Sequence, residues 1–176
     1  MLKKSLFLLL IFLLALLSIA FLRTFMHVAP ESEIARGEVA SIDETAAIQN
    51  LAAAIRFKTI SHQDREKFPK QEFDNFINWA ALAYPEFHAA MKLEQLEHTL
   101  LFKWEGSDLK LAPILLTGHY DVVPIIPGTE NLWEEMPFAG VISNNRIWGR
   151  GALDDKSGVI GMMEAATYLI KNNFNK

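Results

Sequence analysis

The side chains best suited to catalysis or metal binding lie in two short segments of this 176-residue chain. His119 and Asp121 follow an apolar run that begins at Ile114, and the adjacent Asp154 and Asp155 follow a turn that contains glycine. Imidazole and carboxylate groups are common protein ligands of zinc. The chain contains no cysteine, which excludes thiolate ligands, a cysteine nucleophile and disulfides. These residues therefore indicate part of a metal site.

The spacing of His119 and Asp121 predicts that the two act together. In an extended chain, residues two apart point to the same side, so the carboxylate can reach the imidazole. A metal-bound histidine usually donates its other ring N–H to such a group, which fixes its tautomer. His119 is thus a candidate ligand and Asp121 its orienting partner. Taken alone, the pair also fits a histidine at a strand end that a nearby aspartate satisfies without any metal.

The adjacent pair Asp154 and Asp155 also allows two interpretations. Neighbouring carboxylates repel each other unless a cation lies beside them. The start of a helix also eases their charge, and an aspartate there is an ordinary N-cap. The preceding Gly149-Arg-Gly151 suits a backbone that passes close to other atoms. We assign the N-cap role to Asp155, and the residues alone leave the role of Asp154 open.

Three motifs, taken together, resemble one enzyme family. They are GHYDVVP at residues 118–124, W-x-x-x-PF-x-G at residues 133–140 and IWGRGALDDK at residues 147–156. They are similar to the zinc exopeptidase family that includes aminoacylase, glutamate carboxypeptidase and succinyl-diaminopimelate desuccinylase. Within it, the similarity is to the branch of carboxypeptidase S and the N-acyl-amino-acid hydrolases. The resemblance extends from about Thr45 to Asn173.

The resemblance implies a fold and a set of site residues. The implied fold class is α/β, the N-terminal part of a three-layer α/β/α catalytic domain with a mixed sheet, preceded by one transmembrane helix. His119 is implied to bind one zinc ion and Asp154 to bridge two, with cobalt or manganese compatible with the same site. Asp121 is implied to have a catalytic role by orienting the histidine. The family also implies a cis peptide bond between Asp154 and Asp155.

The chain departs from the family pattern after Asp154. Family members carry a Glu-Glu pair, a further acidic ligand and a distal histidine in the later part of the domain, and none of these follows here. We therefore expect an N-terminal fragment that is inactive alone. Glu134-Glu135 precedes Asp154 and is expected to be solvated surface. The remaining histidines lack partners at ligand spacing and are expected at the surface: His27, His62, His88 and His98.

The implied activity is metal-dependent hydrolysis of an amide or peptide bond next to a free carboxylate, as in carboxypeptidases and N-acyl-amino-acid hydrolases. The implied substrates are small peptides or N-acyl amino acids, and a homodimer is compatible with the complete protein. The alternative is a membrane-tethered binding module without catalysis. A serine hydrolase lacks support because no G-x-S-x-G elbow occurs. A net charge of −4 and a pI near 5.7 argue against a nucleic-acid partner.

The N-terminal run Ser5–Leu22 contains 18 residues without a charge, about the length that crosses a bilayer as a helix. We interpret it as a membrane anchor, with a cleaved signal peptide as the alternative. Basic residues before the run outnumber those after it, which places the N-terminus in the cytoplasm and the rest outside, or secreted if cleaved. The expected divisions are the anchor at 1–23, a linker at 24–40 and an incomplete metallohydrolase domain at 41–176.

The periodicity of apolar residues predicts the elements that position the candidate site. A capping-box pattern at Ser41–Glu44 starts a helix that runs to about Arg56. The unbroken apolar run Pro113–Thr117 predicts a strand buried on both faces, which delivers His119. The other expected elements are a helix at 71–84, two antiparallel strands between 91 and 104, short strands at 140–143 and 146–148, and a helix at 156–171.

Overall fold

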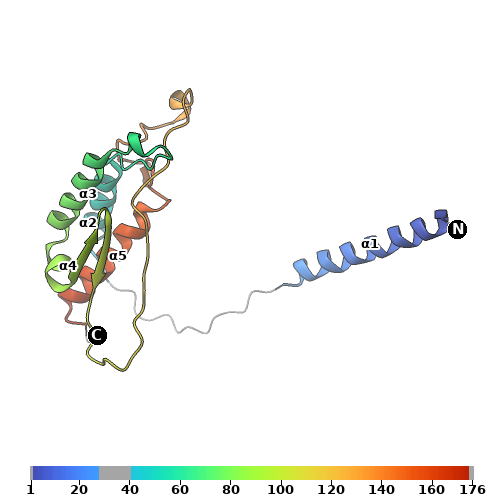
Figure 1. The fold of residues 1–176 in the computed structure, drawn as a ribbon, viewed down its shortest axis with the longest axis horizontal. Helices are drawn as coiled ribbons and strands as arrows, with labels where there is room; N and C mark the ends of the chain where they lie inside the picture. The colour runs from blue at the N-terminus through green and yellow to red at the C-terminus, as the bar shows by residue number, and fades with distance from the viewer. Residues whose placement is uncertain (1, 28–40, 175–176) are drawn as a thin grey trace. The chain divides into compact units, whose positions relative to one another are not determined.

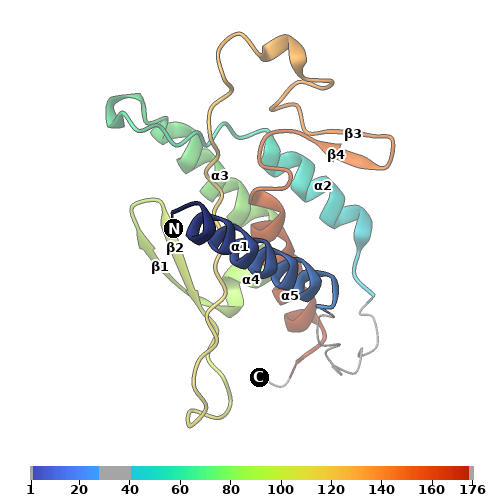
Figure 2. The ribbon, with the colours of Figure 1, turned by 90° about the vertical axis from the view of Figure 1, so that its right-hand side faces the viewer.

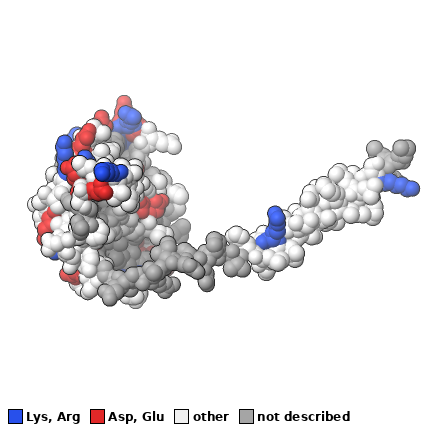
Figure 3. Space-filling model, turned by 90° about the horizontal axis from the view of Figure 1, so that it is seen from below, with Lys and Arg blue, Asp and Glu red and all other residues white. Residues whose placement is uncertain are grey.

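The computed structural model describes residues 2–27 and 41–174 (Figure 1). The chain divides into two compact units, Met1–Ala40 and Ser41–Lys176. The first unit contains helix α1 (Leu2–Phe25), which is long and apolar enough to cross a membrane, a property that signal sequences share. In Figure 3 the surface of α1 is uncharged except for basic residues toward its ends. Most of the predicted linker, residues 28–40, lies outside the described residues.

The second unit combines helices with two short hairpins (Figures 1 and 2). Its elements, in chain order, are α2 (Glu44–Ile55), η1 (Arg65–Lys67), α3 (Lys70–Ala83), α4 (Pro85–Ala90), β1 (Lys92–Leu96), β2 (Thr99–Lys103), η2 (Glu130–Leu132), β3 (Val141–Ser143), β4 (Arg146–Trp148) and α5 (Lys156–Lys171). Strand β1 pairs with β2 and β3 with β4, both antiparallel. A mixture of helices and strands is thus confirmed, whereas a three-layer arrangement around a mixed sheet is not seen among the described residues.

The core lies where α2, α3, α4 and α5 pack together. A hydrogen-bond network reinforces it: the Tyr84 hydroxyl and the Asn50 side-chain amide both donate to Oε1 of Glu164, over 2.7 and 2.8 Å. These part-buried hydrogen bonds link α5 to α2 and to the corner between α3 and α4. The turn before α5, which carries Asp154, is therefore attached to a rigid base. The buried core side chains are Ala54, Phe76, Ala80, Tyr84, Phe87, Val159, Ile160 and Met163.

Two helix boundaries differ from expectation for local reasons. The N-cap of α2 is Asp43, whose carboxylate accepts the N–H of Ala46 at 3.0 Å, so the predicted capping box at Ser41 is wrong. Pro85 ends α3 as predicted, but it also occupies the first turn of α4, an unpredicted helix. A proline is tolerated there because an N–H in the first turn has no acceptor within the helix, so its absence removes no hydrogen bond.

The predicted buried strand at Pro113–Thr117 is wrong. This segment is extended but forms no strand, and the Ile114 and Leu115 side chains are 88% and 75% exposed. A strand requires a backbone partner, and beyond Thr117 the described residues provide a single parallel bridge, between Ile60 and Val122. Figures 1 and 2 show the segment running along the unit without a neighbouring strand. Its apolar composition is typical of a buried strand, but no described strand pairs with this segment.

Candidate metal centre

The segment that carries His119 and Asp121 is held by the loop after α2. Val122 donates its N–H to the Thr59 carbonyl at 2.8 Å, and Ser61 donates its N–H to the Val122 carbonyl at 2.9 Å. The Thr59 hydroxyl donates to the Tyr120 carbonyl at 2.5 Å. These bonds fix the backbone of residues 120–122 as one extended piece, so alternate side chains must point in opposite directions.

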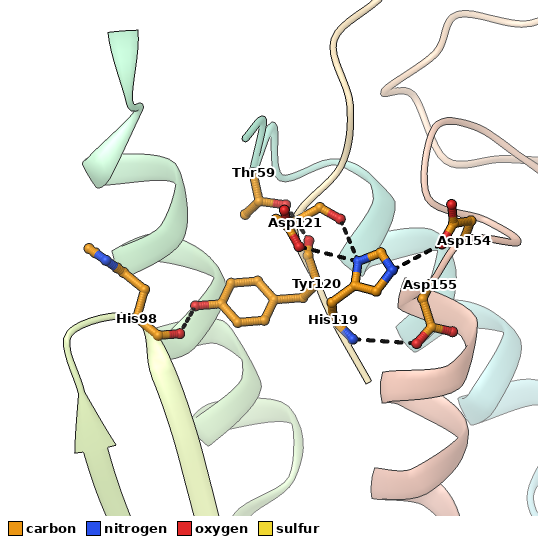
Figure 4. Close-up of polar contacts among 7 residues, drawn as sticks. All are labelled: Thr59, His98, His119, Tyr120, Asp121, Asp154 and Asp155. Atoms are coloured by element: carbon orange, nitrogen blue, oxygen red, sulfur yellow. Dashed lines mark hydrogen bonds and ion pairs between the residues drawn. The ribbon is translucent and has the colours of Figure 1, made fainter. Parts of the chain in front are cut away.

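Of these alternating side chains, that of Tyr120 points toward the core. Its ring stacks on Phe76, with centroids 4.4 Å apart and planes 4° apart, and its hydroxyl donates to the His98 carbonyl (Figure 4). Burial raises the pKa of the Tyr120 hydroxyl, so it remains a donor. With Tyr120 in the core, its neighbours His119 and Asp121 are directed outward to the same side.

The His119 imidazole lies between two carboxylates (Figure 4). Its Nε2 is 3.0 Å from Oδ1 of Asp154, and its Nδ1 is 3.2 Å from Oδ1 of Asp121 and 3.1 Å from the Asp121 carbonyl oxygen. The His119 side chain is 51% exposed and that of Asp154 is 86% exposed. The structure thus brings together all three residues singled out in the sequence, at a site open to solvent.

Two opposing effects act on the pKa of the His119 imidazole. Burial alone would lower it, but the hydrogen bond to Asp121 and the charges of Asp121 and Asp154 stabilise the protonated ring. The net result is a pKa above the usual value for histidine. The two carboxylates on either side of the ring therefore favour its protonated form.

The turn before α5 supplies Asp154 through unusual backbone geometry. Gly149 and Gly151 have φ angles of 147° and 85°, in the region that favours glycine. The peptide bond between Asp154 and Asp155 is cis, as expected. Asp155 is the N-cap residue of α5 but forms no capping bond through its side chain with the described part of that helix. Its Oδ2 instead accepts the N–H of His119 at 3.3 Å, which links the two halves of the site.

The site residues lie in a segment that is similar to a known family. Residues 115–176, which include His119, Asp121 and Asp154, match peptidase family M20/M25/M40. Residues 115–176 therefore carry a segment of this peptidase family. Relatives named carboxypeptidase S and N-fatty-acyl-amino acid synthase/hydrolase agree with the expected branch of the family.

Three relatives of this chain illustrate the similarity. The probable carboxypeptidase S-like 2 of Dictyostelium discoideum is 38% identical over 72% of this chain and 24% of its own length. Carboxypeptidase S of Saccharomyces cerevisiae is 35% identical over 72% of this chain and 23% of its own length. The N-fatty-acyl-amino acid synthase/hydrolase PM20D1 of Mus musculus is 35% identical over 77% of this chain and 27% of its own length. The chain thus spans about a quarter of the length of these relatives.

Peptidases of the M20 family are generally metal-dependent, and the donor set fits a metal in part. Two ligand atoms of a tetrahedral zinc ion, each about 2.0–2.2 Å from it, lie about 3.3–3.6 Å apart. The 3.0 Å between His119 Nε2 and Asp154 Oδ1 is a few tenths of an ångström shorter than this separation. However, no group of three or more His, Cys, Asp or Glu side chains in residues 2–27 and 41–174 is arranged to hold a metal. The described residues therefore provide two adjacent ligand atoms rather than a full coordination shell.

Lys156 is a buried residue next to the site whose structural role the sequence did not predict. It follows Asp155 directly, is fully buried, and donates from Nζ to the carbonyls of Ala54 at 2.9 Å and Phe57 at 2.7 Å. Burial lowers the pKa of its amine to about 8. Lysine is rarely fully buried, so its sequence position beside two aspartates indicated only a helix start. The amine fixes the turn before α5 to the carbonyl of Ala54 in the last turn of α2 and to that of Phe57, just after the helix.

The remaining acidic and histidine side chains lie apart from the site. Glu134 is exposed as expected, whereas Glu135 is partly buried and accepts a hydrogen bond from the Ser143 hydroxyl at 3.4 Å. His98 is partly exposed: its side chain is 19% exposed, packs against aromatic rings and has Nε2 3.3 Å from Oδ1 of Asp74. His98 contributes its backbone carbonyl to the surroundings of the site, as the acceptor of the Tyr120 hydroxyl.

Proposed function

We propose that this chain contributes part of the active site of a zinc-dependent hydrolase that cleaves an amide or peptide bond next to a free carboxylate. The observation that carries the proposal is the meeting of His119 Nε2 and Asp154 Oδ1 at 3.0 Å, although the residues lie 35 positions apart. The names of the relatives point to small peptides or N-acyl amino acids as the substrate class.

Each of the three side chains has a role that its contacts support. His119 offers Nε2 as a metal ligand because Asp121 accepts the proton on Nδ1 and holds the ring in place. Asp154 offers a second ligand and, with two carboxylate oxygens, suits a bridge between two ions. Bound zinc would supply a Lewis acid for the scissile carbonyl and a water with a lowered pKa. The Asp155 carboxylate accepts the backbone N–H of His119 and so helps to position the imidazole.

We further propose that the chain alone binds zinc weakly and does not hydrolyse these substrates. Zinc sites normally use three or four protein ligands, and the described residues provide two. The other ligands and a glutamate that serves as general base are expected from outside the described residues, in a complete three-layer domain. A homodimer of that complete protein remains part of this proposal.

The proposed setting is a membrane. Helix α1 is 24 residues long and apolar, which supports an anchor with the metallohydrolase unit on the extracytoplasmic side. Cleavage of this segment would release the same unit as a secreted protein. The 1–23 anchor, the 24–40 linker and the 41–176 domain are proposed as the corresponding divisions of the chain.

The proposal is tested by calorimetric titration of the full chain with zinc in detergent micelles. Wild type should take up zinc weakly, and His119→Ala or Asp154→Ala should remove most of that uptake. His62→Ala is the matched control, because His62 lies outside the cavity that His119 and Asp154 line. If His119→Ala and Asp154→Ala take up zinc as wild type does, the metal assignment is wrong. Hydrolysis of an N-acyl amino acid by the chain with added zinc would contradict the proposed inactivity.

A further inference from the structure

Arg150 is the charged side chain of the cavity that the proposed metal chemistry leaves unused. It lines a cavity of about 290 Å³ together with His119, Asp121 and Asp154. Its Nε is buried without a hydrogen-bond partner, and its guanidinium forms no ion pair with any residue that the structure describes. Buried polar groups without partners are rare in native proteins. An unpaired guanidinium beside a candidate active site therefore suggests a partner that comes from outside the chain.

The position of Arg150 is fixed before any ligand arrives. Its backbone N–H donates to the Pro137 carbonyl at 2.6 Å, and its Cζ lies 5.1 Å from the centre of the Trp133 ring. The preceding Gly149 sits so close to α2 that an added Cβ would lie 2.4 Å from a methyl group of Ile55. These contacts hold the cation in place, which reduces the entropy lost when a ligand binds.

The charges of the cavity favour an anionic partner at Arg150. Both cavity carboxylates, Asp121 and Asp154, face the ring nitrogens of His119 and so leave the guanidinium without a counter-ion. A guanidinium remains charged at all relevant pH values and matches a carboxylate with two parallel N–H bonds. The cavity volume of about 290 Å³ is at the lower end of small-ligand sites. It therefore suits a small ligand with a carboxylate at one end.

We infer that Arg150 binds the free carboxylate of the substrate, a small peptide or an N-acyl amino acid, while the scissile amide lies toward His119 and Asp154. This inference rests on the proposed function and adds to it a residue that determines specificity. Val123 and Leu153, which also line the cavity, provide apolar surface beside the bound ligand. Arg150 acts by binding and orientation alone and takes no part in bond breaking.

The test compares two ligands that differ only in the carboxylate, N-acetylglycine and the neutral N-acetylglycinamide. Binding to the full chain in detergent micelles, without metal, is followed by NMR at the indole N–H of Trp133, which is assigned with Trp133→Phe. Arg150→Gln removes the charge, and Arg150→Lys keeps the charge without the planar fork. Arg146→Gln is the matched control, because Arg146 also lies over a tryptophan, 5.7 Å from the ring centre of Trp148, but does not line the cavity.

Wild type should bind N-acetylglycine in preference to the amide. Arg150→Gln should weaken N-acetylglycine binding at least about tenfold, as expected for a lost charge-assisted pair. Arg146→Gln should change it less than about twofold, because an exposed cation contributes little. The affinity of Arg150→Lys for N-acetylglycine should fall between those of wild type and Arg150→Gln. If Arg150→Gln does not fold, the affinity of Arg150→Lys alone tests the inference.

Several results would overturn the inference: equal binding of the two ligands, equal effects of Arg150→Gln and Arg146→Gln, Arg150→Lys with wild-type affinity, or inorganic phosphate competing as well as N-acetylglycine. The last result would mean a general anion site. Zinc uptake by Arg150→Gln should match wild type, so the carboxylate and metal functions are separated. Absence of zinc uptake by wild type would contradict the proposed function and leave the comparison of the two ligands to decide the role of Arg150.

Discussion

The buried amine of Lys156 makes the stability of the fold depend on pH in a way that can be calculated. Replacing it in Lys156→Met removes the charge together with the hydrogen bonds to the Ala54 and Phe57 carbonyls. Burial lowers the pKa of the amine from 10.5 to about 8 in the folded chain. Between these two values the unfolded chain binds a proton that the folded chain does not, so the free energy of unfolding rises with pH. A shift from 10.5 to about 8 corresponds to about 3 kcal/mol.

The assay is urea unfolding of the full chain in detergent micelles at several pH values, followed by tryptophan fluorescence. All four tryptophans lie outside α1, so the signal reports on the second unit. The raised pKa values of Tyr84 and Tyr120 lower stability above about pH 10. They act equally in both proteins, and therefore cancel in the difference between wild type and Lys156→Met. That difference should shift by about 3 kcal/mol in favour of wild type from pH 8 to 10.5. A flat difference curve would show that the amine is not buried as described.

Two further predictions concern the contacts around His119. An added Cβ at Gly158 would lie 2.3 Å from Oδ1 of Asp155, whereas one at Gly161 meets nothing within 4 Å. Gly158→Ala should therefore lower the unfolding temperature, and Gly161→Ala, a matched change in the same helix, should raise stability by about 1 kcal/mol; equal effects would contradict the packing at Asp155. Asp154→Asn should lower the pKa of His119, because it removes one of the carboxylates that raise it. Histidine proton NMR measures this change, and a pKa that stays the same or rises would refute the described contact.

The sequence predicted the residues of the site better than the strand expected to carry them. His119 and Asp121 were paired correctly because a two-residue spacing places side chains on one side of any extended chain, whether or not it belongs to a sheet. The strand at Pro113–Thr117 failed for the complementary reason: apolar character indicates a preference for a sheet, but a strand forms only with a backbone partner. Asp154 required the whole family motif, since a helix N-cap explained an aspartate at that position equally well.

Other features depended on tertiary contacts that no local pattern contains. Lysine is normally a surface residue, and the burial of Lys156 depends on the carbonyls of Ala54 and Phe57, which lie far from it in the sequence. The same is true of Asp155, whose carboxylate accepts the N–H of His119 rather than capping its own helix. The unpaired guanidinium of Arg150 likewise became informative only through the cavity that it lines.

The most direct test of the metal assignment is to locate zinc itself. Crystals of the chain grown with zinc, measured at the zinc absorption edge, should show an anomalous peak at bonding distance from both Nε2 of His119 and a carboxylate oxygen of Asp154. Asp121 should remain hydrogen-bonded to Nδ1 on the opposite side of the ring. A peak bound by other side chains, with the contact between His119 and Asp154 unchanged at 3.0 Å, would contradict the assignment.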